Sequence, residues 1–478
     1  MIENIREGLT YDDVLLVPKF SDIVSRKQVD TTTQLTKNIK IKTPIISANM
    51  DSVTESSMAI AMARHGGLGI IHRFMSIEDQ VEEILKVKRS EAIIIEKPYT
   101  LTPEHTIKDA KKLMFNKKIT GILIVDNVGR FAGILTNRDL MFEDNMLKQI
   151  SEVMTPKEKA ITSSVGISID AAKKIFKETK VEKLPLIDKN EILKGLITTK
   201  DIIKRDMHPL ASKDEKGRLL VGGAIGVRGD YLERAEALLD AGCDIICIDI
   251  AHGHSQYVIE TIKALRDKFG DVEIIAGNVA TAEGTLDLIN AGADAIKLGI
   301  GPGSVCLTRV VAGAGVPQLS AILDCVKVAN ELNIPIIADG GIKNSGDITK
   351  ALAAGASTVM LGNMLSGTEE SPGQTVIKGG RKFKIYRGMA GFGANISKRE
   401  RENNKEDISD VVPEGVEGTI PYRGNVSELI YQLVGGLKSG MSYCGAHNIG
   451  ELWKNAEFIK ITAASLKENH PHDIDVLE

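Results

Sequence analysis

Short apolar runs recur along this chain, and amphipathic segments separate most of them. Two runs precede residue 92 and six follow residue 206. They are TPIISA (43–48), GLGIIH (67–72), VGGAIG (221–226), DIICIDI (244–250), EIIAGN (273–278), AIKLGI (295–300), IPIIADG (334–340) and STVMLGN (357–363). Strands that are apolar at consecutive positions bury both faces, which is typical of a parallel sheet covered by helices. Eight such units predict an α/β fold, a closed (β/α)8 or TIM barrel, and argue against an open sheet.

Residues 92–206 follow a different pattern and contain a repeat. VDNVGRFAGILTNRDL (125–140) and IDKNEILKGLITTKDI (187–202) share one plan. Asp126, Gly133, Thr136 and Asp139 recur 62 positions later as Asp188, Gly195, Thr198 and Asp201. A helical pattern precedes each copy, so we predict two tandem strand–helix–strand–strand–helix units. The expected domains are a first barrel part (1–91), two small domains (92–150 and 151–206) and a second barrel part (207–478).

Composition narrows the function classes. The 478 residues are 43% apolar and 26% charged, with a net charge of −4, which offers no basic field for nucleic acid. The amino terminus has early acids and no apolar core of a signal peptide, and no apolar run approaches the length of a membrane helix. The five cysteines are an odd number without CxxC spacing. We therefore expect a reducing cytoplasm, no disulfide framework and no zinc site.

Candidate chemistry lies where the strands end, because catalytic groups of this fold occupy the carboxyl ends of its strands. Those ends carry Asn49–Met50–Asp51, His72–Arg73, Asp249, Asn278, residues 301–309, Asp339–Gly340–Gly341 and Gly362–Asn363. ADGGI and LGNM follow the last two strands, where glycines let backbone N–H groups approach an anion. Plain turns are the alternative, but the pairing favours a phosphorylated ligand.

Cys306 stands apart from the other cysteines. It lies in GPGSVCLTR (301–309), a glycine-rich loop after the sixth strand. Cys243 and Cys247 alternate within apolar sequence, Cys325 falls in a helical pattern, and Cys444 is best read as packed. A cysteine on the catalytic face with small neighbours can act as an accessible thiolate nucleophile. A packed apolar role is the alternative for Cys306.

The motifs together resemble the inosine-5'-monophosphate (IMP) dehydrogenase family nearly end to end. The matching stretches are GLTYDDVLLVP, ISANMDSVTE, GGLGIIHRFMS, IDIAHGHS, AGNVAT, GIGPGSVCLTRVVAGAGVPQ, ADGGI, YRGM, PEGVEG and SLKENHPHD. The repeat resembles a pair of cystathionine-beta-synthase (CBS) domains, inserted where this family carries them. The CBS resemblance implies that Thr136, Asp139, Thr198 and Asp201 contact the ribose and phosphate of a regulatory purine nucleotide. A purely structural pair is the alternative.

The resemblance implies a two-step reaction in guanine nucleotide biosynthesis. Cys306 would attack the purine of IMP, hydride would pass to NAD, and the covalent adduct would be hydrolysed to xanthosine monophosphate with Thr308 and Glu414 in the catalytic set. The implied substrate contacts are Met50, Ser304, Asp339, Gly341, Gly362, Asn363, Tyr386, Gly388, Met389 and Glu414. The implied cofactor contacts are Asp249, Asn278, Gly299 and Gly301. Backbone carbonyls of Gly301, Gly303 and Cys306 would hold potassium, and the family forms homotetramers or octamers.

One departure keeps other functions open. The family's mobile flap, about residues 388–424 here, normally carries an Arg-Tyr pair whose arginine activates water. This chain reads AGFGANISKRERENNKEDISDVV (390–412), with Arg399, Arg401 and Lys405 but no Arg-Tyr. Guanosine-5'-monophosphate (GMP) reductase shares the barrel and the cysteine and lacks that pair, although reductases usually lack the CBS insert. A non-catalytic nucleotide sensor is the third hypothesis, and the joint presence of Cys306, Thr308, Asp339 and Glu414 argues against it.

Overall fold

The computed structural model describes residues 5–91, 94–391, 412–469 and 471, without the side chains of 201 and 204–206. The chain divides into two compact units. The first comprises Met1–Ser90, Leu210–Asp214 and Leu219–Glu478, and the second Glu91–Pro209 with Glu215–Arg218. No helix among the described residues is long and apolar enough to cross a membrane.

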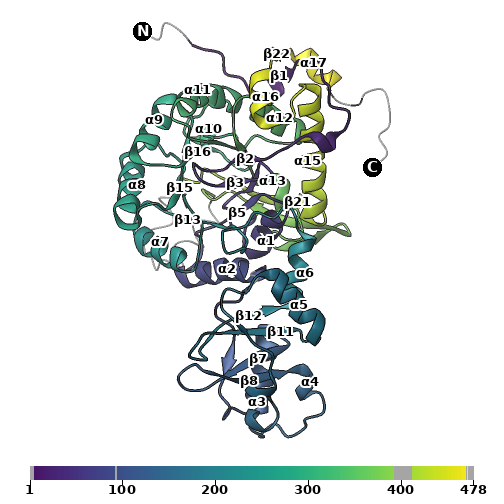
Figure 1. Ribbon diagram of the computed structural model, residues 1–478. Coiled ribbons are helices and arrows are strands. Elements are labelled where there is room, and N and C mark those ends of the chain that lie inside the picture. Colours follow the sequence, from purple (N-terminus) through teal and green to yellow (C-terminus); the bar gives the residue numbers. More distant parts are fainter. Residues whose placement is uncertain (1–4, 92–93, 392–411, 470, 472–478) are drawn as a thin grey trace. The chain divides into compact units, whose positions relative to one another are not determined.

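The first unit is a closed barrel of eight parallel strands, as the apolar runs predict (Figure 1). The strands are β4 (Ile45–Ser47), β5 (Leu68–Ile71), β13 (Gly222–Ile225), β14 (Ile245–Ile248), β15 (Glu273–Val279), β16 (Ala295–Leu298), β17 (Ile336–Asp339) and β18 (Thr358–Leu361). The sheet closes where β18 pairs with β4, with Val359 opposite Ile45, and where β5 pairs with β13. The TIM-barrel prediction is confirmed.

Alternation along β14 shows why its sequence is apolar throughout. Ile245 and Cys247 belong to one core cluster with Ile70 and Ile337, residues of other barrel strands. Ile246 and Ile248 belong to a second cluster that includes residues of the surrounding helices, such as Leu238 and Val258. Since side chains alternate across a strand, one set fills the barrel and the other packs against the helices.

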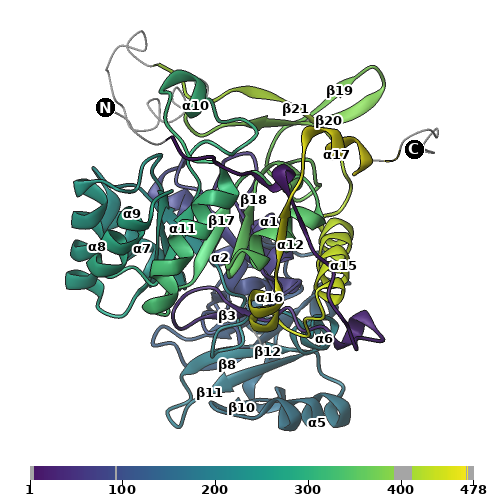
Figure 2. The same ribbon diagram turned by 90° about the horizontal axis from the view of Figure 1, so that it is seen from above.

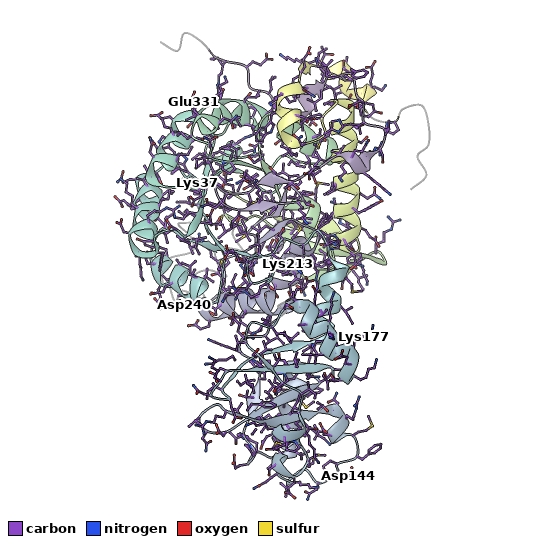
Figure 3. All side chains as sticks on the ribbon, in the orientation of Figure 1. Lys37, Asp144, Lys177, Lys213, Asp240 and Glu331 are labelled. Carbon is purple, nitrogen blue, oxygen red and sulfur yellow. The ribbon has the colours of Figure 1, made fainter. Side chains whose placement is uncertain are left out.

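Amphipathic helices form the outer ring. They are α1 (Ser56–Arg64), α2 (Ile77–Ser90), α7 (Tyr231–Asp240), α8 (Gln256–Phe269), α9 (Ala282–Ala291), α11 (Gln318–Glu331), α12 (Ser345–Ala353) and α15 (Val426–Tyr443). Asp240 and Glu331, at the ends of α7 and α11, mark the exposed side of this ring in Figure 3.

Short elements complete the first unit. They are η1 (Tyr11–Asp13), β1 (Val14–Leu16), η2 (Arg26–Gln28), β2 (Thr33–Gln34), β3 (Lys40–Ile41), α10 (Thr308–Val311), α13 (Asn363–Ser366), β19 (Thr375–Lys378), β20 (Arg381–Arg387), β21 (Glu417–Pro421), α16 (Ile449–Asn455), β22 (Phe458–Lys460) and α17 (Ala463–Glu468). Figure 2 shows the β19–β20–β21 sheet on the same side of the barrel as α10, the short helix that follows Cys306. This places two segments distant in sequence at the carboxyl ends of the strands.

The second unit contains two copies of the predicted plan. The first copy has β6 (Thr100–Leu101), α3 (Ile107–Lys117), β7 (Gly121–Val125), β8 (Phe131–Thr136) and α4 (Asn137–Leu140), followed by η3 (Ile150–Glu152), β9 (Thr155–Pro156) and η4 (Lys157–Lys159). The second has β10 (Ser163–Ser164), α5 (Ile169–Thr179), β11 (Lys183–Ile187), β12 (Leu193–Thr198) and α6 (Thr199–Met207). Leu123, Phe131 and Leu196 form a shared core between the copies. Each copy thus completes its burial against the other.

Candidate active site

Cys306 lies between β16 and α10, and its environment differs from that of every other cysteine. Cys306 is partly exposed, whereas the other four are buried. Burial raises the pKa of the Cys243 and Cys247 thiols to about 12 and that of Cys325 to about 11. Only the thiolate is strongly nucleophilic, so these buried thiols are inert at neutral pH. The site that the sequence marks is the one with access to a ligand.

Cys306, Thr308 and Glu414 form a continuous hydrogen-bonded line. The Cys306 thiol donates to Thr308 Oγ1 at 3.2 Å, and the Thr308 hydroxyl donates to Glu414 Oε2 at 2.7 Å. Backbone pairing holds the two segments together, because Leu307 N donates to the Glu414 carbonyl at 2.7 Å and Val416 N to the Val305 carbonyl at 3.0 Å. A proton leaving the thiol therefore has a path through one hydroxyl to a carboxylate.

Glycines surround the expected phosphate position with backbone. A Cβ at Gly340 would lie 2.9 Å from Pro302 Cγ, and one at Gly362 would lie 3.0 Å from the Tyr386 hydroxyl. The Tyr386 hydroxyl also donates to Met50 Sδ at 3.8 Å. Burial raises the pKa of Tyr386 to about 12, with a bond to Ser304 opposing that rise. Tyr386 is therefore a neutral donor at physiological pH, which suits an anionic ligand.

The remaining predicted substrate residues lie in the same place. Asn363 is the first residue of α13, directly after Gly362. A Cβ at Gly341 would lie 3.4 Å from Cε2 of Tyr11 and 3.5 Å from Cβ of Pro302 in the cysteine loop. Met389 Sδ accepts a bond from Asp51 N at 3.4 Å. A Cβ at Gly388 would lie 2.8 Å from the Val305 carbonyl oxygen, so the segment that follows β20 abuts the cysteine loop.

A buried cation supports Asp339, and the sequence analysis missed it. Lys297 Nζ lies 3.0 Å from Asp339 Oδ2, and its side chain is only 4% exposed. Asn278 Nδ2 donates to the same oxygen at 2.9 Å, and Lys297 also donates to Asn278 Oδ1. Burial alone would lower the pKa of Lys297, but Asp339 and other nearby groups outweigh it, and the pKa is raised. The sequence signal for this pair is a lysine within the apolar run AIKLGI, because a lysine is rarely buried unless it is paired.

Asn278, which the family resemblance assigns to the cofactor, thus bonds Asp339, which the resemblance assigns to the substrate. It also donates to the Gly299 carbonyl at 2.9 Å, which ties it to the start of the cysteine loop. Asp249 lies after β14 and accepts from Arg73 Nε at 3.1 Å. A second pairing that the sequence did not reveal joins Arg387 Nε to Asp51 Oδ2 at 2.8 Å. It connects the end of β20 to the loop after β4.

The cysteine loop also suits a monovalent cation. Potassium is coordinated by neutral carbonyl oxygens in selective sites. Gly301 has φ +83°, and a Cβ at Gly303 would lie 3.6 Å from that of Cys306, so these glycines allow the loop to turn tightly beside the cysteine. The donor chemistry of Gly301, Gly303 and Cys306 therefore fits the ion. Within the described residues no group of three or more His, Cys, Asp or Glu side chains could hold a metal.

Comparison with known proteins agrees with this geometry. The profile described as "IMP dehydrogenase / GMP reductase domain" matches residues 8–472. The chain belongs to this family. The inosine-5'-monophosphate dehydrogenase of Nitrosopumilus maritimus is 53% identical over 98% of this chain and 99% of its own. That of Bacillus subtilis is 54% identical over 98% of this chain and 96% of its own.

Solved structures of family members include reductases. A cysteine-to-alanine variant of Trypanosoma brucei GMP reductase, in complex with GMP, superposes with a TM-score of 0.93 at 46% identity and covers 98% of this chain and 99% of its own. The same organism's reductase in complex with guanosine 5'-triphosphate matches with a TM-score of 0.82 at 41% identity, over 96% and 99% of the two chains. A reductase of this family therefore spans the insert as well. The presence of the insert does not separate dehydrogenases from reductases.

The remaining predicted residues belong to the flap and to the insert. Arg399, Arg401 and Lys405 lie outside the described residues. In the insert, the Thr136 backbone N–H and hydroxyl both donate to Asp139 Oδ2 at 2.7 Å, which caps α4. Thr198 ends β12, and the side chain of Asp201 is not described. A ribose at the first of these positions would contact a pair that is already held in place.

Proposed function

We propose that this protein is an NAD-dependent IMP dehydrogenase that works through a covalent Cys306 adduct. The observation that carries the proposal is the line Cys306–Thr308–Glu414, which combines a partly exposed thiol with a route for its proton. Nucleophilic catalysis divides one difficult oxidation into two easier steps. Identity of 52% to 54% over nearly the full length of dehydrogenases from several organisms supports the same conclusion.

In the first step the Cys306 sulfur forms a bond to carbon 2 of the purine, and the electron pair of the double bond between carbon 2 and nitrogen 3 moves to nitrogen 3. The thiol proton moves to Thr308 while the Thr308 proton moves to Glu414. Carbon 2 then loses a hydride as the double bond re-forms, which oxidises the purine. NAD, when bound, supplies the acceptor for that hydride. Asp339 accepts a hydrogen bond from a ribose hydroxyl, because its known partners both use Oδ2 and Oδ1 offers further acceptor capacity.

In the second step water adds to carbon 2 and the carbon–sulfur bond breaks, which yields xanthosine monophosphate and the free thiol. Glu414, which has released the proton of the first step to solvent, takes one proton of this water through Thr308, since the Thr308–Glu414 bond already has a length of 2.7 Å. That proton returns to the departing sulfur, and the other proton of the water stays on the base. Tyr386 and the backbone around Gly341 and Gly362 hold the phosphate. Asp249 and Asn278 would lie on the cofactor side, and the carbonyls of Gly301, Gly303 and Cys306 would hold potassium.

GMP reduction is the second candidate, and two observations favour it. The flap sequence lacks the Arg-Tyr pair, and reductase structures match almost the whole chain. A reductase would use the same cysteine to release ammonia from GMP and would take hydride from NADPH. The test follows absorbance at the nicotinamide wavelength with IMP plus NAD and, separately, with GMP plus NADPH. NADH formation supports the proposal, whereas NADPH oxidation without NADH formation overturns it.

Assembly, location and regulation extend the proposal. We infer a homotetramer or an octamer in a reducing cytoplasm, from the family resemblance and from five free thiols without a disulfide. The paired copies of the second unit support a CBS module that binds a purine nucleotide near Thr136 and Asp139. Light scattering measures the assembly, and calorimetry with adenine and guanine nucleotides tests the second unit.

A further inference from the structure

The cysteine loop runs from Gly299 to Pro317 and contains an arginine, Arg309, that has no role in the proposed reaction. Arg309 lies in α10, three residues after Cys306. Its Nε donates to the Ile300 carbonyl at 3.3 Å, and its Nη2 donates to the Val316 carbonyl at 2.6 Å. One planar group therefore bridges the two ends of the loop. These carbonyls differ from those of Gly301, Gly303 and Cys306, which are proposed for potassium.

Two glycines make room for this side chain. A Cβ at Gly301 would lie 2.7 Å from Arg309 Nε, and a Cβ at Gly315 would lie 2.7 Å from Arg309 Cγ. Both glycines have positive φ angles, +83° and +154°, so side chains are disfavoured there for conformational reasons as well. The arginine passes between the entering and leaving limbs of the loop, and both limbs are shaped around it.

Backbone pairing with residues 414–416 fixes the cysteine loop at Val305 and Leu307, and the bridge from Arg309 links its two limbs. Gly301, Gly303, Gly313 and Gly315 give it high backbone freedom, and ordering each residue costs about 1–2 kcal/mol of conformational entropy. Val310 is 82% exposed, so little apolar burial fixes the loop tip. Gln318 anchors only the base of the loop, where Nε2 donates to the Leu298 carbonyl at 2.9 Å. Between base and tip, the Arg309 guanidinium connects the limbs.

We propose that Arg309 is a positioning residue that holds the Cys306 sulfur where it can attack the nucleotide. The inference rests on the proposed function, because it assumes that Cys306 reacts. Arginine suits this role since its rigid planar fork can serve two carbonyls at once, whereas a lysine ammonium is a point donor on a flexible stem. A small displacement of a nucleophile can lower a rate by about 10²-fold.

The chain offers a matched control in Arg266 of α8. Arg266 also packs against a glycine, and its guanidinium also donates to carbonyls, with Nε bonding Gly292 at 2.9 Å and Nη1 bonding Gly270 at 3.0 Å. It lies before β15, at the opposite end of the barrel from Cys306. Arg266→Lys removes these bonds, a further bond to the Val272 carbonyl and the guanidinium's ion pair with Asp294, without touching the cysteine loop.

The experiment compares Arg309→Lys and Arg266→Lys with the unaltered protein. Amide hydrogen exchange in residues 300–316 tests the bridge without reference to activity. We expect exchange there to rise at least tenfold in Arg309→Lys and to stay unchanged in Arg266→Lys. Equal exchange in the two variants overturns the proposal, whatever their activities.

A rapid-mixing measurement of NADH formation tests the consequence for Cys306. With saturating IMP and NAD, Arg309→Lys should lower the rate constant of the first turnover about 10- to 100-fold while its amplitude and the dissociation constant of IMP stay within twofold. A merely structural role would lower the amplitude and keep the rate constant. That result, or an unaltered rate constant, contradicts the positioning role.

The unaltered protein separates this inference from the proposed function. If it forms no NADH but oxidises NADPH with GMP, the dehydrogenase proposal fails, and the same comparison of variants is made on NADPH oxidation. If Arg309→Lys then oxidises NADPH with the same rate constant as the unaltered protein, the positioning role is overturned independently.

Discussion

Removal of the buried Lys297 charge should lower the free energy of unfolding, because it leaves the Asp339 carboxylate without its cation. Breaking a buried ion pair by removing one partner usually costs about 3–5 kcal/mol, because a charge is left unpaired. Asp339 keeps its bond from Asn278, and its side chain is 23% exposed. We therefore expect Lys297→Met to cost about 3 kcal/mol, which is roughly 160-fold in the unfolding equilibrium of the barrel.

The single tryptophan makes this measurable. Trp453 lies in α16 of the first unit, so its fluorescence in a urea titration follows the barrel. The double variant Lys297→Met/Asp339→Asn removes both charges and should recover most of the lost stability. If the double variant is no more stable than Lys297→Met, the unpaired charge is not the cause, and the reasoning is refuted.

The pH dependence has a definite sign. The folded-state pKa of Lys297 is raised, so its stabilising contribution is fully present below the pKa of an unfolded lysine and is lost as pH rises through the folded value. Between pH 5 and 8 it contributes no slope in the unaltered protein. As pH rises above about 10.4, the ordinary pKa of lysine, the free energy of unfolding of the unaltered protein should fall toward that of Lys297→Met, which lacks this contribution.

Four further outcomes are expected. Cys306→Ala should abolish turnover with either nucleotide pair while the unfolding curve is retained, whereas Cys243→Ala should cost roughly 1 kcal/mol of stability and leave the chemistry intact. Because burial raises the pKa of Cys247 to about 12, native protein at pH 8 should take up iodoacetamide at Cys306 alone, as peptide mass analysis would show; labelling of Cys247 in folded protein would contradict this. Glu414→Gln should slow hydrolysis more than hydride transfer, so that a burst of NADH precedes a low steady rate and adduct mass accumulates on the intact protein. Deletion of residues 92–206 with a short linker should keep the basal reaction and remove any response to purine nucleotides, and loss of that reaction in a folded variant would show that the insert takes part in catalysis.

The fold could be predicted from sequence because its signal is local. Each barrel strand is apolar at consecutive positions, and both of its faces are buried, as Ile245, Ile246, Cys247 and Ile248 show. The repeat at 125–140 and 187–202 predicted two similar units, because this signal is also local in the sequence. Chemistry-bearing residues could be found because parallel strands end on one face of the barrel, so that Cys306, Asp339 and Gly362 had to lie near one another.

Pairings between distant segments required the tertiary structure. Lys297 and Asp339 are on neighbouring strands, and Arg387 meets Asp51 across 336 positions of sequence. The Arg309 bridge between Ile300 and Val316 depends on how a glycine-rich loop closes, and many closures share one sequence pattern. Sequence marks which side chains can carry charge or donate a bond. Which partner each one meets is decided by packing, because an ion or donor is stabilised only where the fold brings its counterpart within bonding distance.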